Sequence, residues 1–182
     1  ASDTPANEAS PLAPSNPYAA TKAAADQLVL GEIYGNAFPA TIVRSSNNFG
    51  HYQNEEKFIP KMMACLKAHR AIPIYGDGSQ MRTWLSAKTF SKFLYALMTQ
   101  GTTGDVINIR GEETLSNLEL AQRIRSIYER CLGCEAAPIT HIADRKNHDT
   151  FYHIDNEKQR KRLPEIEFES LSDFIETSFK DQ

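Results

Sequence analysis

Tyr18 and Lys22 stand four residues apart in the stretch Pro-Tyr-Ala-Ala-Thr-Lys. Side chains at this spacing share one face of a helix. A free phenol has a pKa near ~10 and is a poor base at neutral pH, whereas a nearby ammonium group favours the phenolate. The pair therefore predicts a tyrosine that takes up a proton in catalysis if the segment is helical. The alternative is a surface tyrosine beside a solvated lysine, because this spacing also arises by accident.

Cationic, amide and aromatic side chains downstream could hold a phosphorylated ligand. Three cations could neutralise a diphosphate, because guanidinium and ammonium groups suit phosphate oxygens. They are Lys57, Arg82 and Arg145. Three asparagines offer amide groups that could bind a base, sugar or phosphate, namely Asn47, Asn48 and Asn108. Tyr75 could lie flat against a nucleobase. The alternative for each is a solvated charge or a turn residue.

The elements that must position these groups alternate between helix and strand. The Ala- and Leu-rich stretch from Tyr18 predicts a helix of about four turns that ends at Gly35-Asn36. Ser116 and Glu119 form a capping-box pattern at the start of another helix. Further helices are predicted over 56–69, 88–99, 117–130 and 171–179, and strands over 40–44, 72–75, 106–109 and 139–143. This alternation predicts an α/β fold.

The first residues differ from the start of a nucleotide-binding domain. Residues 1–17 contain four prolines and predict an irregular N-terminal segment. A doubly wound nucleotide-binding domain begins with a strand, a Gly-rich turn and a helix. The sequence contains no segment of that form. We therefore expect this sequence to be the second part of a larger arrangement.

Composition excludes several classes of protein. The 182 residues include 20 Lys and Arg against 23 Asp and Glu, a net charge of −3, which gives no reason to expect nucleic acid as a partner. No stretch approaches the ~18–20 apolar residues of a membrane helix, and the N-terminus lacks the apolar core of a signal peptide. Three cysteines imply no disulfide framework, so we expect a reducing, cytoplasmic compartment.

Two candidate metal sites lack the pattern that a metal needs. Cys131 and Cys134 form a Cys-x-x-Cys at a helix end, but zinc would need two more ligands and His141 is the nearest candidate. A redox role would need the motif to open a helix after a strand. The run from His148 to Asp155 is predicted to be extended, so its side chains cannot converge on one ion. We therefore expect no metal.

Several blocks of sequence, in one order, resemble the extended short-chain dehydrogenase/reductase family, and within it the dTDP-glucose 4,6-dehydratases. The blocks span residues 17–26, 44–50, 56–60, 73–84, 108–111 and 143–149. The resemblance implies that Tyr18 is the base at the hexose 4-hydroxyl. It implies that Lys22 holds the phenolate and the nicotinamide ribose, and that Ser46 also contacts NAD. The implied substrate-binding residues are Asn47, Asn48, Lys57, Pro73, Tyr75, Arg82, Asn108, Arg145 and His148.

The fold that the resemblance implies is the C-terminal portion of a Rossmann-type domain, interleaved over residues 18–182 with the small α/β nucleotide-sugar-binding lobe. The implied reaction is that of an NAD-dependent lyase: oxidation at C4, loss of water between C5 and C6, and return of the hydride to C6. The implied partners are a dTDP- or UDP-hexose and a second copy of the chain, which would pack through the helix from Tyr18.

The sequence departs from the family pattern in four places, one of which is residues 86–89, Ser-Ala-Lys-Thr, where the family usually has an aromatic residue and an acidic pair. Thr83 stands where the family usually has Asp, and both the Thr-Asp-Glu motif and the Gly-rich dinucleotide loop are missing. We therefore expect these residues to be inactive alone. A nucleotide-sugar 4-epimerase or decarboxylase of the same family is one alternative. A truncated, non-catalytic homologue that binds a nucleotide sugar is the other.

Overall fold

The computed structural model describes residues 5–144, 151–163 and 165–180, so Arg145 and His148 lie outside the described residues. Its helices are α1 (Pro17–Asn36), α2 (Phe58–Lys67), α3 (Ala87–Thr99), α4 (Asn117–Leu132), α5 (Glu157–Arg162) and α6 (Leu171–Lys180). Its strands are β1 (Thr41–Ser45), β2 (Asn47–Phe49), β3 (Ile72–Tyr75), β4 (Met81–Ser86), β5 (Asp105–Ile109), β6 (Glu113–Ser116), β7 (Ile139–Ile142) and β8 (Phe151–Tyr152). The α/β class is thereby confirmed.

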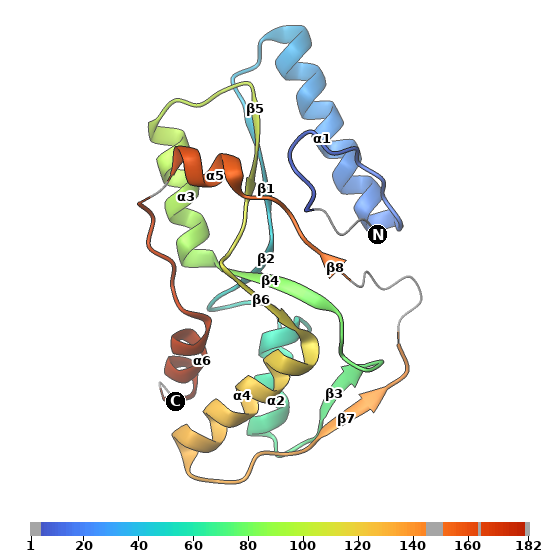
Figure 1. Cartoon of the computed structure of the whole chain (residues 1–182), viewed down its shortest axis with the longest axis vertical. Helices are drawn as coiled ribbons and strands as arrows, with labels where there is room; N and C mark the ends of the chain where they lie inside the picture. Colours follow the sequence, from blue (N-terminus) through green and yellow to red (C-terminus); the bar gives the residue numbers. More distant parts are fainter. Residues whose placement is uncertain (1–4, 145–150, 164, 181–182) are drawn as a thin grey trace.

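One part of the molecule is built on the parallel pair β1–β5, which lies between α1 and α3 in Figure 1. One face of this pair packs against α3, where Phe93 and Leu97 are buried with Ile107 and Ile109, and Val43 lies partly buried against them. Among the described strands, β1 pairs with β5 alone, so its other edge has no neighbour. This open edge agrees with the expectation of a partial Rossmann sheet.

The other part surrounds two further sheets at the lower end of Figure 1. β4 pairs in parallel with β2 and β8 and antiparallel with β6, while β3 pairs in parallel with β7. Helices α2, α4 and α6 contribute most of a second core, whose fully buried members include Leu66, Leu120, Ile124 and Ile175. The predicted capping box at the start of α4 is confirmed, with Ser116 and Glu119 bonded reciprocally.

The strands β2, β4, β6 and β8 were not among the predicted elements. β4 alternates Arg82, Trp84 and Ser86 with Met81, Thr83 and Leu85, and its C-terminal half is buried on both faces. Such a strand has no simple alternation of polar and apolar residues, and its pairing depends on residues far away in the sequence. Its conformation is therefore set by tertiary contacts that a local pattern does not contain.

Helix α1 is mostly exposed. Ile33 is its one buried residue, whereas Leu28 and Tyr34 expose 74% and 77% of their surface. Apolar side chains of this size are normally covered when they cluster on one helix. None of the helices in the described part of the chain has the length and apolar character needed to cross a bilayer.

Candidate functional site

Tyr18 and Lys22 lie on the first turns of α1, where the sequence predicted them. Asn16 caps the helix by accepting the Ala19 N–H at 2.9 Å, and Pro17 occupies the first helical position. The Lys22 ammonium lies 5.7 Å from the centre of the Tyr18 ring. Tyr18 is 71% exposed. The two side chains therefore share a face that is open to a ligand.

An ion pair fixes this helix to the sheet. Arg44, near the end of β1, donates to the Asp26 carboxylate at 2.7 Å, and both side chains are about four-fifths buried. The same guanidinium donates to the Glu8 carbonyl at 3.3 Å. Because α1 runs antiparallel to β1, these contacts place Tyr18 beyond the carboxyl end of the strand. Ligands bind at that end in open parallel sheets.

Ser46 forms the corner between β1 and β2 and is 4% exposed. Its backbone N–H donates to Ile109 O at 3.0 Å, and its hydroxyl accepts the Gly111 N–H at 3.2 Å. The residue thus joins the ends of β1 and β5 at the edge where Tyr18 lies. Its predicted contact with NAD stays a prediction.

Asn47 and Asn48 begin β2 directly after this corner, and both are half-buried. The Asn48 side chain donates to the Ser45 hydroxyl at 3.1 Å, and its backbone carbonyl accepts from Gln53 at 2.9 Å. Its side-chain oxygen is buried without a hydrogen-bond partner in the described structure. A buried oxygen of this kind is costly unless a ligand or water donates to it. Asn48 is therefore suited to accept from a hydroxyl of a bound sugar.

The predicted nucleotide residues come from β3, β4 and the start of α2. Pro73 and Tyr75 share one half-buried face of β3, because Ile72 and Ile74 fill the opposite face. Arg82 is half-buried on β4 and donates to the Met81 carbonyl at 2.7 Å.

Lys57 precedes α2, is exposed, and belongs to no ion pair that the described residues form. Its ammonium group is therefore available to an anion. The roles of the β3 and β4 residues and of Lys57 stay predictions.

Asn108 has a structural task that the sequence did not reveal. It is 1% exposed, its backbone N–H donates to the Glu8 carboxylate at 2.9 Å, and its side chain donates to the Ala6 carbonyl at 3.2 Å. It therefore anchors the N-terminal segment on β5, and this burial leaves little of its surface for a substrate. Its predicted role in substrate binding stays untested.

A polar cluster follows directly on β5. The Gln159 side chain accepts the Arg110 backbone N–H at 2.7 Å and donates to the Arg110 carbonyl at 3.1 Å. Burial, with the charge of Arg110 beside it, lowers the pKa of His153 below its usual value. Gln159 therefore holds the chain just after β5 in place. No local pattern signals this role, because a glutamine within a basic run is usually solvated.

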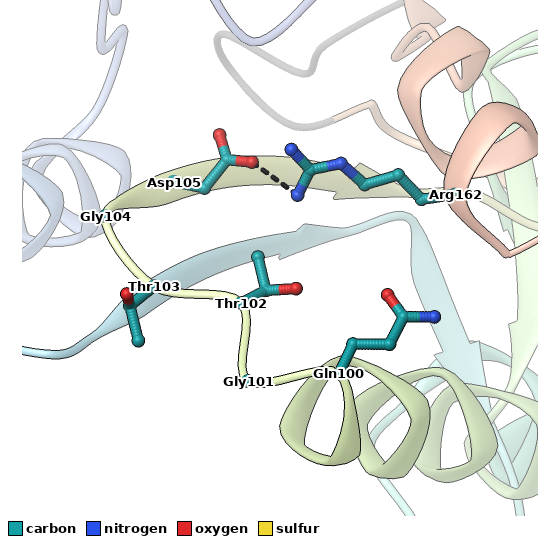
Figure 2. A pocket seen from close by; sticks show the side chains of 7 residues that line it. All are labelled: Gln100, Gly101, Thr102, Thr103, Gly104, Asp105 and Arg162. Atoms are coloured by element: carbon teal, nitrogen blue, oxygen red, sulfur yellow. Dashed lines mark ion pairs between the residues drawn. The ribbon is translucent and has the colours of Figure 1, made fainter.

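A surface pocket lies at the opposite edge of the sheet. Figure 2 shows its lining, the loop from Gln100 to Asp105 together with Arg162, around a volume of about 660 Å³. Arg162 pairs with Asp105 at 2.6 Å, and Lys158 also donates to this carboxylate. Burial raises the pKa of Asp105, but these cationic partners outweigh it and hold the pKa below its usual value. None of the predicted site residues lies here, at the amino ends of β1 and β5.

Comparison with known proteins gives one consistent family. A profile described as GDP-mannose 4,6 dehydratase matches residues 1–173. The chain belongs to this family. A dTDP-glucose 4,6-dehydratase of Neisseria gonorrhoeae is 36% identical over 171 residues, which cover 90% of this chain and 49% of that protein. The chain thus spans about half the length of the curated relatives that it matches.

Solved structures of dehydratases and epimerases have the same fold. The dTDP-glucose 4,6-dehydratase DesIV of Streptomyces venezuelae, solved with NAD bound, has a TM-score of 0.87 at 30% identity and covers 99% of this chain and 55% of its own. The UDP-glucuronic acid 4-epimerase of Bacillus cereus, also with NAD, has a TM-score of 0.86 at 23% identity, with 98% and 56% covered. NAD is therefore the cofactor found in this family.

Proposed function

We propose that these residues provide the base-bearing helix and the nucleotide-sugar lobe of an NAD-dependent nucleotide-sugar 4,6-dehydratase, as its C-terminal part. The observation that supports this most is the Tyr18–Lys22 pair, exposed on one face of α1 beyond the carboxyl end of β1. The unsatisfied side-chain oxygen of Asn48 adds to it, because Asn48 follows the corner at the same edge. The similarity to dTDP-glucose 4,6-dehydratases over 90% of the chain favours glucose as the sugar and dTDP as the carrier.

In this proposal Tyr18 accepts the proton of the sugar 4-hydroxyl. The Lys22 ammonium lies 5.7 Å from the centre of the Tyr18 ring, on the same exposed face of α1. NAD, when bound, accepts the hydride from C4 and later returns it. The chain itself holds the base in a fixed position relative to the sugar, because the ion pair of Arg44 with Asp26 keeps α1 at the end of the sheet.

The nucleotide would lie on the half-buried face of β3, with Pro73 and Tyr75 against the base. The guanidinium of Arg82 and the ammonium of Lys57 would neutralise the diphosphate. Binding should therefore be measurable on this chain by itself. We expect calorimetry at low salt to show weak affinity for dTDP or UDP, and the Arg82→Ala variant to lose at least about tenfold, or ~1.4 kcal/mol.

Arg70→Ala is the matched control, because Arg70 is exposed before β3 and belongs to no ion pair that the described residues form. It should leave affinity within twofold of wild type, about 0.4 kcal/mol. Absence of binding at millimolar nucleotide would show that the lobe is not organised in these residues alone, and equal losses in the two variants would remove Arg82 from the site.

Turnover is not expected from the 182 residues on their own. Hydride transfer needs reacting atoms held about 3–3.5 Å apart, and the pyrophosphate of a dinucleotide is normally held by a Gly-rich turn before a helix N-terminus. These residues contain no such turn. With NAD and dTDP-glucose, we expect no 4-keto-6-deoxy product above the level of the Tyr18→Phe variant. Product above that level would reveal a cofactor site in these residues and refute this part of the proposal.

Two other functions stay open to the same measurements. A 4-epimerase, the activity named for the Bacillus cereus protein of the same fold, is one alternative, and its product would keep the substituent at C6. A decarboxylase is the other alternative within the family, and its product would lose a 6-carboxylate. A non-catalytic nucleotide-sugar binder would bind dTDP but would form no product from dTDP-glucose and NAD. We further propose a cytoplasmic homodimer that packs through α1, whose exposed surface includes Leu28 and Tyr34. Light scattering that finds a monomer at high concentration would oppose the dimer.

A further inference from the structure

The end of α4 brings two thiols to one place. Cys131 is the second-last residue of the helix and is half-buried, whereas Cys134 follows the helix and is exposed. Between them, Gly133 adopts a left-handed conformation with φ 65° and donates its N–H to Glu129 O at 2.9 Å. This is a common way to end a helix, and it turns the chain sharply at the residue before Cys134.

The chain after this turn folds back along the helix. The Ala136 N–H donates to the Glu129 carboxylate at 3.1 Å, and Arg125 donates to the Ala136 carbonyl at 3.1 Å. Residue 136 therefore lies level with the turn of α4 that precedes Cys131. Cys134, two residues earlier, is held beside the end of the helix and does not extend away from it.

Both thiols border the same aromatic side chain. Tyr128 is 2% exposed and lies three residues before Cys131, so the two are neighbours on one face of α4. Burial, together with the Cys134 thiol near its hydroxyl, raises the pKa of Tyr128. From α6, Phe179 packs edge-on against the Tyr128 ring at 5.3 Å, and the Lys180 ammonium interacts electrostatically with Cys131.

We propose that Cys131 and Cys134 are a dithiol site that a small disulfide, such as glutathione disulfide, oxidises to an intramolecular disulfide. The exposed Cys134 thiolate attacks one sulfur of glutathione disulfide, forms a mixed disulfide and releases one glutathione thiolate. The Cys131 thiolate then attacks the Cys134 sulfur and releases the second glutathione. The protein loses two electrons and two protons, and glutathione disulfide gains them as two thiols.

The position of the two thiols at a helix C-terminus determines how reactive they are. Thiols that act as catalysts lie at helix N-termini, where the helix dipole stabilises the thiolate, and the C-terminus has the opposite effect. The site is therefore a slow, reversible switch that depends on the redox state of the surroundings. In the oxidised form the start of the segment that leads to β7 is covalently tied to α4.

The experiment equilibrates the reduced chain with glutathione buffers of increasing oxidising strength and counts thiols after denaturation. We expect the three thiols of Cys65, Cys131 and Cys134 to fall to one. Trypsin cleaves after Arg130 and next after Arg145, so peptide 131–145 contains both cysteines. On oxidation the mass of this peptide should fall by that of two hydrogen atoms. The Cys131→Ser variant should stop at a glutathione adduct on Cys134, and the Cys65→Ala control should oxidise like wild type.

The same equilibration is repeated on the chain unfolded in denaturant. This separates the effect of the fold on disulfide formation from the effect of two cysteines being close in sequence. The folded chain should favour the disulfide over the unfolded chain by at least about tenfold in the equilibrium constant. Three remaining thiols at the most oxidising ratio, disulfide-linked dimers through Cys134, or equal constants for the folded and unfolded chains would each overturn the proposal.

Discussion

Gly111 has no space for a side chain, and this makes the Gly111→Ala substitution a stringent test of the structure. A Cβ atom there would lie 1.7 Å from the Trp84 carbonyl oxygen and 2.6 Å from its carbon. Contact distances between non-bonded heavy atoms are about 3.5–4.0 Å for carbon, so the overlap is well over 1 Å. Trp84 cannot move away, because β2 and β6 pair with β4 on both sides of it.

The cost can be built from the contacts that must change. Forcing a methyl group into a packed site costs about 1–3 kcal/mol. The shift of Gly111 that accompanies this also breaks its bond to the Ser46 hydroxyl and disturbs the two bonds between Gln159 and the preceding residue, each worth about 0.5–1.5 kcal/mol. We expect a loss of about 3–6 kcal/mol in the free energy of unfolding, a large part of the ~5–15 kcal/mol that a domain has.

Two other glycines are matched controls. At Gly31, inside α1, and at Gly133, an added Cβ atom would have no other atom within 4 Å. Gly31→Ala should stabilise by up to about 1 kcal/mol through helix propensity. Gly133→Ala should cost about 1–2 kcal/mol, because its φ of 65° disfavours a side chain. Urea unfolding followed by circular dichroism gives the midpoints. A Gly111→Ala midpoint equal to that of Gly133→Ala would refute the close packing of Gly111 against β4.

Three further substitutions test contacts that hold the fold. Asp26→Asn weakens the pair with Arg44 and should lower the free energy of unfolding by about 1–3 kcal/mol, measured in urea. Gln159→Leu leaves two buried backbone groups without partners and should cost about 1–3 kcal/mol per group, whereas a change under about 0.5 kcal/mol would contradict the burial of this amide. Because the pKa of Asp105 is lowered in the folded chain, its contribution is present above an unfolded value near ~3.9 and is lost as the pH falls through the folded value. Asp105→Asn should therefore be less stable at pH 7 and lose less stability between pH 5 and pH 2, measured by thermal unfolding.

Local sequence patterns predicted the helices better than the strands. The helix from Tyr18 and the strand over 72–75 were predicted closely, since strong helix formers define the first and two buried isoleucines with a following Gly turn define the second. β4 and β6 were missed because Thr83 and Thr114, whose hydroxyls contact at 2.8 Å, form a polar pair in the middle of the strands. Residues of that type predict a strand only when the partner strand is known.

The candidate site was predictable where chemistry depends on neighbours along a helix, as for Tyr18 and Lys22. It was not predictable where partners are distant. The contact of Glu8 with Asn108 spans 100 residues, and that of Gln159 with Arg110 spans 49. Neither residue type signals its partner, because carboxylates and amides are usually solvated. The residues that hold the site in place are therefore those whose partners cannot be predicted from the sequence.

The N-terminal segment has a consequence for the order in which the chain can assemble during synthesis. Ala6 pairs with Ile154, and its N–H and carbonyl bond to residues 153 and 155. Its partners leave the ribosome after almost all of the other residues, several seconds later at about 5–20 residues per second. Until then α1 can form, β1 can meet β5, and Glu8 can bond to Arg44 and Asn108, but the bonds of Ala6 to residues 153 and 155 cannot form. In a translating ribosome the residues around Ala6 should therefore stay open to proteases until residues 153–155 have emerged, and their protection would mark the moment when this pairing forms.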